Sequence, residues 1–242
     1  LVGGQLSRVV VPGPLVFSES APPAREGATS PPAARRLESG NGQLTFAADG
    51  RTIDAAVLDG GVKLSEGTRL SVRAPHASLR GADETAVFAG SAETPARYED
   101  EKSRVSATVL TWFRRDDRIE GVGSVKTTFR GREGSDVLGG SPDAPVFSES
   151  DFLRVTPSER KVLLTGNVTA WQEENVLRAQ SILLDDKERA LRAEGNVRAV
   201  LRRRRVDPKS KASTVETVTA TGSVLTHREA DRLLRVEGSS SV

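Results

Sequence analysis

A short motif of glycine, a small or polar residue, and then valine or alanine recurs six times along the chain. The copies begin at Gly60, Gly90, Gly123, Gly166, Gly195 and Gly222, so that successive glycines are 30, 33, 43, 29 and 27 residues apart. A period near 30 residues is typical of a stacked architecture, in which each repeat buries its apolar face against its neighbours. The repeat therefore constrains the fold more than any single segment does.

The residues around each glycine alternate between apolar and polar. Near Gly195, Leu191 and Val197 fall on one face of an extended chain. Arg192 and Glu194 fall on the opposite face, because side chains in a strand alternate with a period of two. A glycine on the apolar face of such a strand indicates a bend or a close approach of two backbones.

A second pattern, apolar–x–Ala–x–x–apolar–x–apolar, precedes three of the glycines. Its copies are Val72-Ala74-Ala77-Leu79, Val105-Ala107-Leu110-Trp112 and Leu177-Ala179-Ile182-Leu184. The double spacer after the alanine predicts a β-bulge with its extra residue in this strand. A charged turn follows, as at 185–189, and then the glycine strand. The repeat unit is therefore a hairpin of two unlike strands.

Composition narrows the class of protein further. Of the 242 residues, 36% are hydrophobic and only 4% aromatic, which favours a thin repetitive sheet over a thick globular core. The net charge of +2 gives no indication of a nucleic-acid-binding protein, and the absence of cysteine excludes a disulfide framework. No apolar run reaches the length that a membrane helix needs. Because position 1 is not methionine, we expect that residue 1 is not the encoded start, so that any signal peptide or anchor lies outside this sequence.

Breaks in composition suggest four parts. Residues 1–40 form an N-terminal segment with a Pro-rich loop or disordered linker over 21–38, and residues 41–135 a first β module. A linker at 136–145 leads to a second module over 146–242, which a charged loop at 202–213 interrupts. The pentapeptide Val-Phe-Ser-Glu-Ser occurs at 16–20 and again at 146–150, so each half is expected to open with a similar strand.

The run from Leu177 to Asp185, the charged turn after it, and Ala193-Glu194-Gly195-Asn196-Val197 resemble the OstA-like repeat of the lipopolysaccharide-transport (Lpt) proteins. These are the LptA-type bridge, the LptC-type anchored subunit and the N-terminal domain of the LptD-type translocon. The resemblance is best over 146–200, fair over 60–130 and 214–238, and absent over 1–40. It implies an all-β fold, an elongated, twisted antiparallel β-jellyroll of V shape, here in two consecutive modules. It also implies a periplasmic location in a Gram-negative cell and a role in outer-membrane biogenesis.

A lipid carrier of this kind needs an apolar trough, because free acyl chains do not cross water unaided. The candidate lipid-binding residues are the inward-facing apolar side chains of the alternating strands. They are Val62, Leu64, Val72, Phe88, Val105, Leu110, Val125, Phe129, Leu164, Val168, Leu177, Ile182, Leu191, Val197 and Val224. The competing interpretation is that these side chains only pack the two sheets together.

Two further sites concern partners. Arg202, Arg203, Arg204 and Arg205 are candidates for contact with lipid phosphates, since guanidinium groups match phosphate geometry, although a solvated loop has the same composition. Leu234 and Val236 lie in the last apolar strand, a candidate edge for pairing with another Lpt-type protein or a second copy. The expected partners are thus lipopolysaccharide and like modules, with no nucleic acid.

Catalysis has little support in the sequence. The two histidines, His76 and His227, stand in separate repeats, and no metal-ligand spacing or nucleotide loop is present. We therefore expect no catalytic residue, no metal and no cofactor. Two other functions stay open, a self-assembling β-solenoid scaffold and a carbohydrate-active β-helix enzyme. The uneven repeat spacing favours antiparallel hairpins over the regular coils that both would need.

Overall fold

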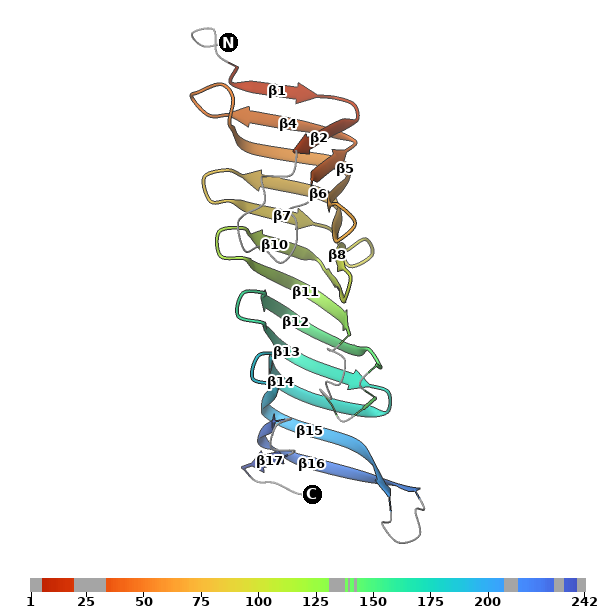
Figure 1. Cartoon of the computed structure of the whole chain (residues 1–242). Helices are drawn as coiled ribbons and strands as arrows, with labels where there is room; N and C mark the ends of the chain where they lie inside the picture. The colour runs from red at the N-terminus through yellow and green to blue at the C-terminus, as the bar shows by residue number, and fades with distance from the viewer. Residues whose placement is uncertain are drawn as a thin grey trace, which may run out of the picture. The chain divides into compact units, whose positions relative to one another are not determined.

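A computed structural model of the chain describes residues 6–19, 34–130, 138, 140–141, 143–206, 213–228 and 233–238 (Figure 1). All regular elements in these ranges are β-strands, seventeen in number. In the same ranges there is no helix with the length and hydropathy needed to cross a bilayer. The chain divides into unit 1, Leu1–Gly121, and unit 2, Val122–Val242, which are described separately below. The strand pairs of both units are antiparallel, so the predicted all-β antiparallel fold class is confirmed.

Unit 1 contains ten complete strands and the start of an eleventh. They are β1 (Arg8–Val11), β2 (Leu15–Glu19), β3 (Arg35–Ser39), β4 (Asn41–Phe46), β5 (Ile53–Glu66), β6 (Leu70–Arg80), β7 (Thr85–Ala89), β8 (Ala96–Asp100), β9 (Ser103–Ala107), β10 (Val109–Phe113) and β11 (Arg118–Phe129). The two longest complete strands, β5 and β6, each belong to two arms of sheet. The first half of β5 pairs with β4 and its second half with β3, while β6 pairs with β8 and then with β7.

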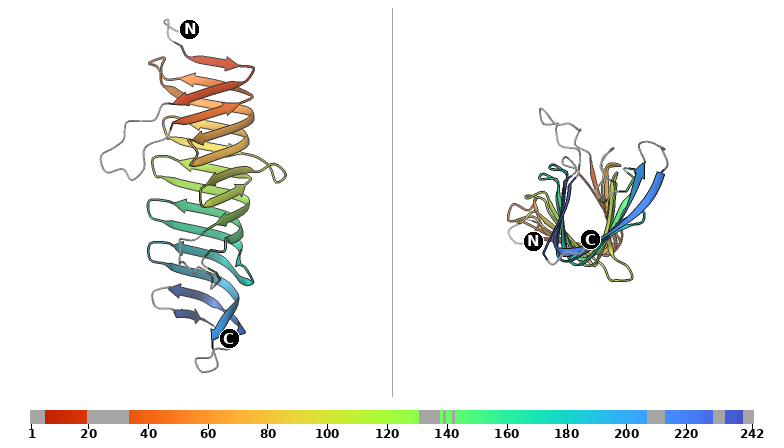
Figure 2. Two further views of the ribbon diagram at one scale, coloured as in Figure 1. Left: turned by 45° about the vertical axis from the view of Figure 1, so that its right-hand side comes forward. Right: turned by 90° about the horizontal axis from the view of Figure 1, so that it is seen from below.

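The strands of unit 1 therefore form a first arm, which contains β1, β4, β7 and β10, and a second arm, which contains β2, β3 and β8. The middles of β5 and β6 join the two arms. Figure 2 shows the curvature of the strands from the side and end-on. This is the arrangement of a β-jellyroll with bent strands, as the sequence predicts.

Unit 2 is built from the end of β11 and six further strands. They are β12 (Val146–Thr156), β13 (Lys161–Gln172), β14 (Asn175–Asp185), β15 (Ala190–Val206), β16 (Ser213–Arg228) and β17 (Leu233–Glu237). Each strand from β12 to β17 pairs with the next one in sequence. The predicted hairpins of unlike strands are thus present, for example β14 and β15 around the charged turn.

The repeat glycines mark the bends. In β15, Gly195 has φ +78° and Asn196 has φ +49°, and the register with β14 shifts at these residues. Gly166 and Asn167 do the same in β13. Two residues of the glycine strand oppose Gln180 alone, so the extra residue lies in the glycine strand. The prediction that the extra residue of the bulge lies in the strand with the alanine pattern is wrong. Two consecutive residues with positive φ bend the glycine strand, and the same set of its side chains faces inward before and after the bend.

The second and sixth copies of the motif differ from the others, because neither Gly90 nor Gly222 has a positive φ. Gly222 has no positive φ and pairs in register with Val197 as part of β16. Every second strand of this unit, β11, β13 and β15, contains a repeat glycine with positive φ. The corresponding glycine of β17 is Gly238, directly after the strand, with φ +95°. The sequence Leu-Arg-Val-Glu-Gly at 234–238 corresponds to Leu-Arg-Ala-Glu-Gly at 191–195, a match that the motif of glycine plus valine misses.

Two predicted loops are partly strand. Residues 35–39 form β3, although they fall in or beside the Pro-rich segment assigned to a loop over 21–38. Residues 202–206 continue β15, and Ser213 begins β16, so the predicted charged loop covers two strand ends. The remaining residues of both segments, 21–33 and 207–212, lie outside the described residues. The predicted division into an N-terminal segment and two modules stays a prediction.

Large apolar side chains on the inner face of unit 2 are buried. Leu153, Leu164, Leu177 and Ile182, from both sides of the bends, are each 0–1% exposed. The described part of the connection between β11 and β12 is hydrogen-bonded to the end of the β13–β14 hairpin. There the buried Gln172 amide donates hydrogen bonds to the carbonyl oxygens of Ser141 (2.9 Å) and Ala144 (3.0 Å), and the Asn175 amide donates one to that of Leu138 (3.0 Å).

Candidate functional site

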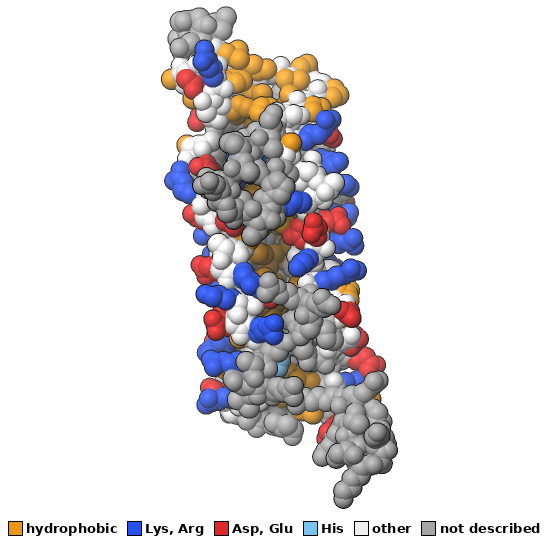
Figure 3. Space-filling model, in the orientation of Figure 1, with side chains coloured by type: hydrophobic (Ala, Val, Ile, Leu, Met, Phe, Trp, Pro, Cys, Tyr) orange, Lys and Arg blue, Asp and Glu red, His pale blue; other side chains and the backbone are white. Residues whose placement is uncertain are grey.

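The two arms of unit 1 enclose an open cavity of about 640 Å³ near strands β1–β5. Its floor consists of apolar side chains from both arms. They are Leu15, Phe17, Leu37, Leu44, Phe46, Ile53, Ala56, Leu64, Leu79, Ala86 and Trp112. In Figure 3, hydrophobic side chains are visible at this end of the unit, with charged side chains along both flanks. The volume lies within the range of small-molecule sites in proteins.

Inward-facing side chains stay accessible in this cavity. Phe17 points into it and is 45% exposed, and Leu37, Leu44 and Leu64 are only half-buried. The reason is the order of strands, since β1 and β2 are the last strands of their arms within unit 1. No further described strand of the unit covers the floor there.

A few strands away, the interior of the same unit is filled. Between β6 and β10 the space left among Val72, Phe88, Tyr98, Leu110 and their neighbours is only about 10 Å³. Phe88 is 1% exposed and Leu110 2%. Large aromatic side chains therefore close this part of unit 1, whereas the part near β2–β5 is lined chiefly by aliphatic side chains that leave room.

Arginines stand on both rims of the cavity. Arg35 lies on the second arm, and Arg51, Arg80 and Arg114 lie at the turns of the first arm. Arg35 forms an ion pair with Glu66 at 3.3 Å. The exposed guanidinium groups of Arg51, Arg80 and Arg114 make no ion pair with any described residue. The cavity lining also includes the exposed carboxylate of Glu84, but the arginines outnumber it. An excess of positive charge above an apolar floor suits a ligand with an anionic head and apolar chains.

Close contacts between turns hold this rim in place. The Gly81 N–H donates a hydrogen bond to the carbonyl oxygen of Asp54 (2.7 Å), and a Cβ at position 81 would lie 2.6 Å from the carbonyl oxygen of Ile53. Only glycine allows the β6–β7 turn to approach β5 so closely. The N–H of Arg114 donates to the carbonyl oxygen of Glu84 (3.0 Å), which ties the next turn to this one.

In the turn before β5, the Asp49 carboxylate accepts hydrogen bonds from the N–H groups of Arg51 (2.8 Å) and Thr52 (2.9 Å) and from the Thr52 hydroxyl (2.5 Å). The hydroxyl bond first, and then the two backbone bonds, lower the pKa of Asp49. The ionised carboxylate thereby fixes the turn that presents Arg51 at the rim.

Most of the fifteen predicted lipid-binding residues belong to the core and not to the cavity. Twelve are buried, with exposures of 1–7%, whereas Leu64, Phe129 and Val224 are half-buried. Of the fifteen, only Leu64 lines the 640 Å³ cavity. The alternation thus identified inward faces, except at Val224. This residue lies opposite the exposed Glu194, whereas Leu225 is buried opposite Ala193, because the register shift at Gly195 changes which residues of β16 face inward. Contact with lipid stays a prediction for these residues.

Sequence reasoning missed most of the cavity. Leu15, Phe17 and Leu37 belong to segments interpreted as an N-terminal region and a Pro-rich loop. One signal was available, because Leu15 and Phe17, like Leu37 and Ser39, are spaced as in a strand. Trp112, the last apolar residue of one copy of the alanine pattern, is half-buried and lines the cavity.

The candidate phosphate and partner sites lie in unit 2. Arg202 is in β15, where its guanidinium forms an ion pair with Glu174 and its N–H donates to the side-chain oxygen of Asn175 (2.6 Å). The side chains of Arg203, Arg204 and Arg205 are outside the described residues. Leu234 and Val236 lie in β17, which within the described part of unit 2 pairs with β16 alone. Phosphate contact and edge pairing stay predictions.

No protein-family model matches the sequence, and no curated protein matches it. Among solved structures, the chain is similar to a crystal structure of LptH from Pseudomonas aeruginosa, described as the LptA homologous periplasmic component of the conserved lipopolysaccharide transport device. The similarity covers 62% of this chain and 93% of that chain, with 14% sequence identity and a TM-score of 0.44. A likeness at this level says nothing about function.

Proposed function

We propose that this chain is a non-enzymatic carrier that binds the acyl chains of lipopolysaccharide in the trough of unit 1. The observation that supports the proposal is the cavity of about 640 Å³, whose inward-facing floor is apolar yet half-exposed. A soluble domain gains stability by burying such side chains, so a floor left open favours a ligand that covers it.

The energetics suit a lipid. Burying acyl chains contributes about 0.8 kcal/mol per CH₂ group, so even a partly buried chain is bound strongly. The rim adds a preference for anionic amphiphiles, because Arg51, Arg80 and Arg114 have no carboxylate partner among the described residues and are free to meet a phosphate. An uncharged lipid would gain only the apolar part of this interaction.

The sequence resemblance to the OstA-like repeat supports the same role and its setting. We place the chain in the periplasm of a Gram-negative cell, as one component of a lipopolysaccharide-transport bridge. The edge of β17 that no described strand of unit 2 pairs with carries Leu234 and Val236, and it is the proposed joint to another Lpt-type module, since an unpaired strand edge accepts a further strand.

Site-specific photo-crosslinking tests the proposal. A photoreactive side chain replaces Leu44, on the floor of the cavity, and in a second protein it replaces Val57. Val57 is the matched control, because it lies on the adjacent strand β5 but is 51% exposed on the outer face. We expect purified lipopolysaccharide to crosslink at position 44 and not at 57. Equal labelling at both positions, or none at 44, would contradict the proposal.

A further inference from the structure

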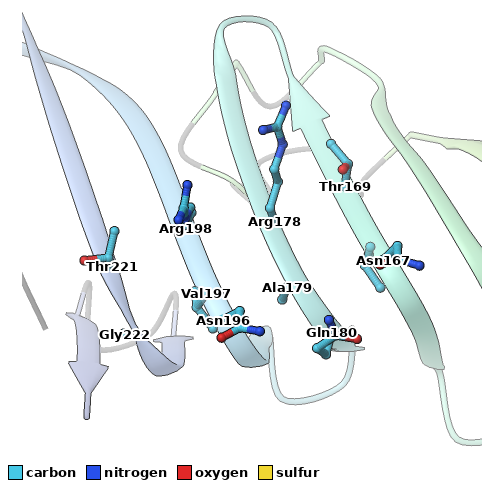
Figure 4. A pocket seen from close by; sticks show the side chains of 11 residues that line it. Asn167, Thr169, Arg178, Ala179, Gln180, Asn196, Val197, Arg198, Thr221 and Gly222 are labelled. Carbon is cyan, nitrogen blue, oxygen red and sulfur yellow. The ribbon is translucent and has the colours of Figure 1, made fainter. Parts of the chain in front are cut away.

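The outer face of unit 2 carries two arginines directly opposite each other. The register pairs Thr169 with Arg178, Arg178 with Arg198, and Arg198 with Thr221, so these four residues form one row across β13, β14, β15 and β16. Both arginines are exposed. Figure 4 shows their side chains rising from neighbouring strands on the same side of the sheet.

Like charges directly opposite in a sheet are destabilising, and the surroundings here do not offset the repulsion. Two acidic residues of β12, Glu149 directly opposite Thr169 and Asp151 farther along the strand, have other partners. Glu149 forms an ion pair with Lys126 at 3.1 Å, and Asp151 accepts a hydrogen bond from the Asn167 amide at 3.0 Å. Neither Arg178 nor Arg198 forms an ion pair with a described residue.

The two arginines lie in a shallow groove of about 720 Å³. Its described lining contains no carboxylate. The amides of Asn167, Gln180 and Asn196 and the hydroxyls of Thr169 and Thr221 supply the other polar groups, as Figure 4 shows. The amides stand at the bends, where Gly166 and Gly195 turn the strands, so the fold itself gathers them beside the arginine row.

We propose that this groove binds a phosphate group. Two adjacent guanidinium groups can each donate paired hydrogen bonds to phosphate oxygens, and a dianion between them converts their repulsion into attraction. The hydroxyls and amides are donors of the kind that complete such a site or contact a sugar beside the phosphate. The site belongs to unit 2 and does not depend on the acyl-chain cavity of unit 1.

Calorimetric titration of the full chain at low salt tests this inference with three probes. They are inorganic phosphate, glucose 6-phosphate, and vesicles of a neutral phospholipid with one fifth phosphatidic acid. The variants are Arg178→Gln combined with Arg198→Gln, and the matched control Arg228→Gln, which removes an exposed arginine elsewhere in unit 2. Thermal unfolding of each variant monitors the fold.

We expect at least one probe to bind, with affinity about tenfold or more weaker in the double variant, because charge-assisted hydrogen bonds are lost. The control variant keeps the affinity, and the double variant does not unfold at a lower temperature. Binding of the two soluble probes indicates a free phosphorylated ligand, and binding of vesicles alone indicates a lipid headgroup. Absence of binding by all three probes, or an equal loss in the control, would overturn the inference.

Discussion

At the scale of single residues, Gly195 adopts a backbone conformation that favours glycine. It has φ +78°, and a Cβ at this position would lie 2.8 Å from Cβ of Gln180. Replacing Gly195 by alanine should therefore cost about 1–3 kcal/mol in the free energy of unfolding, measured by urea denaturation. Gly13→Ala is the control, because a Cβ there has nothing within 4 Å and φ is not positive, so its effect should stay within about 0.5 kcal/mol.

Replacing Arg178, unlike replacing Gly195, should not destabilise the protein. Because Arg198 faces it directly across β14 and β15, Arg178→Gln should leave the free energy of unfolding unchanged or raise it by about 0.2–1 kcal/mol. The gain should shrink at high salt, which screens exposed charges. A clear loss of stability at low salt would show that an attractive contact of Arg178 outweighs the repulsion.

Single residues also show where local sequence fails to determine orientation. The first four residues of the repeated pentapeptide, Val-Phe-Ser-Glu, lie in β2 and again in β12, yet their faces are reversed. In β2, Phe17 lines the cavity and Val16 is exposed. In β12, Val146 is buried and Phe147 stacks on Trp171 with ring centroids 5.6 Å apart. The register of the neighbouring strands, which a pentapeptide does not encode, decides which face turns inward.

At the scale of elements, the glycine strands and their hairpins were predictable, because strict alternation survives the bend. The alternating set from Leu191 to Leu201 is buried as expected, apart from Gly195, which is half-buried. The strand β3 and the end of β15 were not predictable from composition. Prolines and repeated arginines there resemble a loop, but pairing with β5 and β16 overrides that local preference.

The turn at Asp49 gives a pH-dependent prediction for one element. Since hydrogen bonds lower the pKa of Asp49 in the folded state, the carboxylate stabilises the turn above the ordinary pKa of an aspartate, and this contribution is lost as pH falls below about 4. We expect the protection factors of the Arg51 and Thr52 amides, the ratios of intrinsic to observed exchange rates measured by NMR, to fall over this range. In Asp49→Asn, exchange should be fast already at neutral pH. A turn equally protected at pH 3 and pH 7 would contradict this assignment.

At the scale of the whole molecule, alternation predicted which side chains face inward but not whether the space between the arms is filled. Leu177 and Leu64 satisfy the same pattern, yet Leu177 is 1% exposed and Leu64 lines an open cavity. Whether such an inward side chain is covered depends on how many strands lie beside it and on how bulky the side chains are that face it. Neither quantity is local in the sequence.

Paired substitutions separate the closed and open parts of the interior. Leu177→Ala should lower the free energy of unfolding by about 2–5 kcal/mol, because it leaves a cavity in a filled core. Leu44→Ala should cost less, since its side chain is already half-exposed, and should weaken lipopolysaccharide binding instead. Denaturation and fluorescence-based lipid binding measure the two effects. The reverse pattern would assign the lipid to the interior of unit 2.

The most direct test is NMR of the full chain with labelled leucine methyl groups, titrated with lipopolysaccharide. Contact with acyl chains predicts intermolecular NOEs to the methyl groups of Leu37, Leu44, Leu64 and Leu79, leucines on the floor of the cavity. The methyl groups of the buried Leu153, Leu164 and Leu177 should show none. NOEs confined to the second set, or no NOE to either set with the lipid bound, would contradict the account.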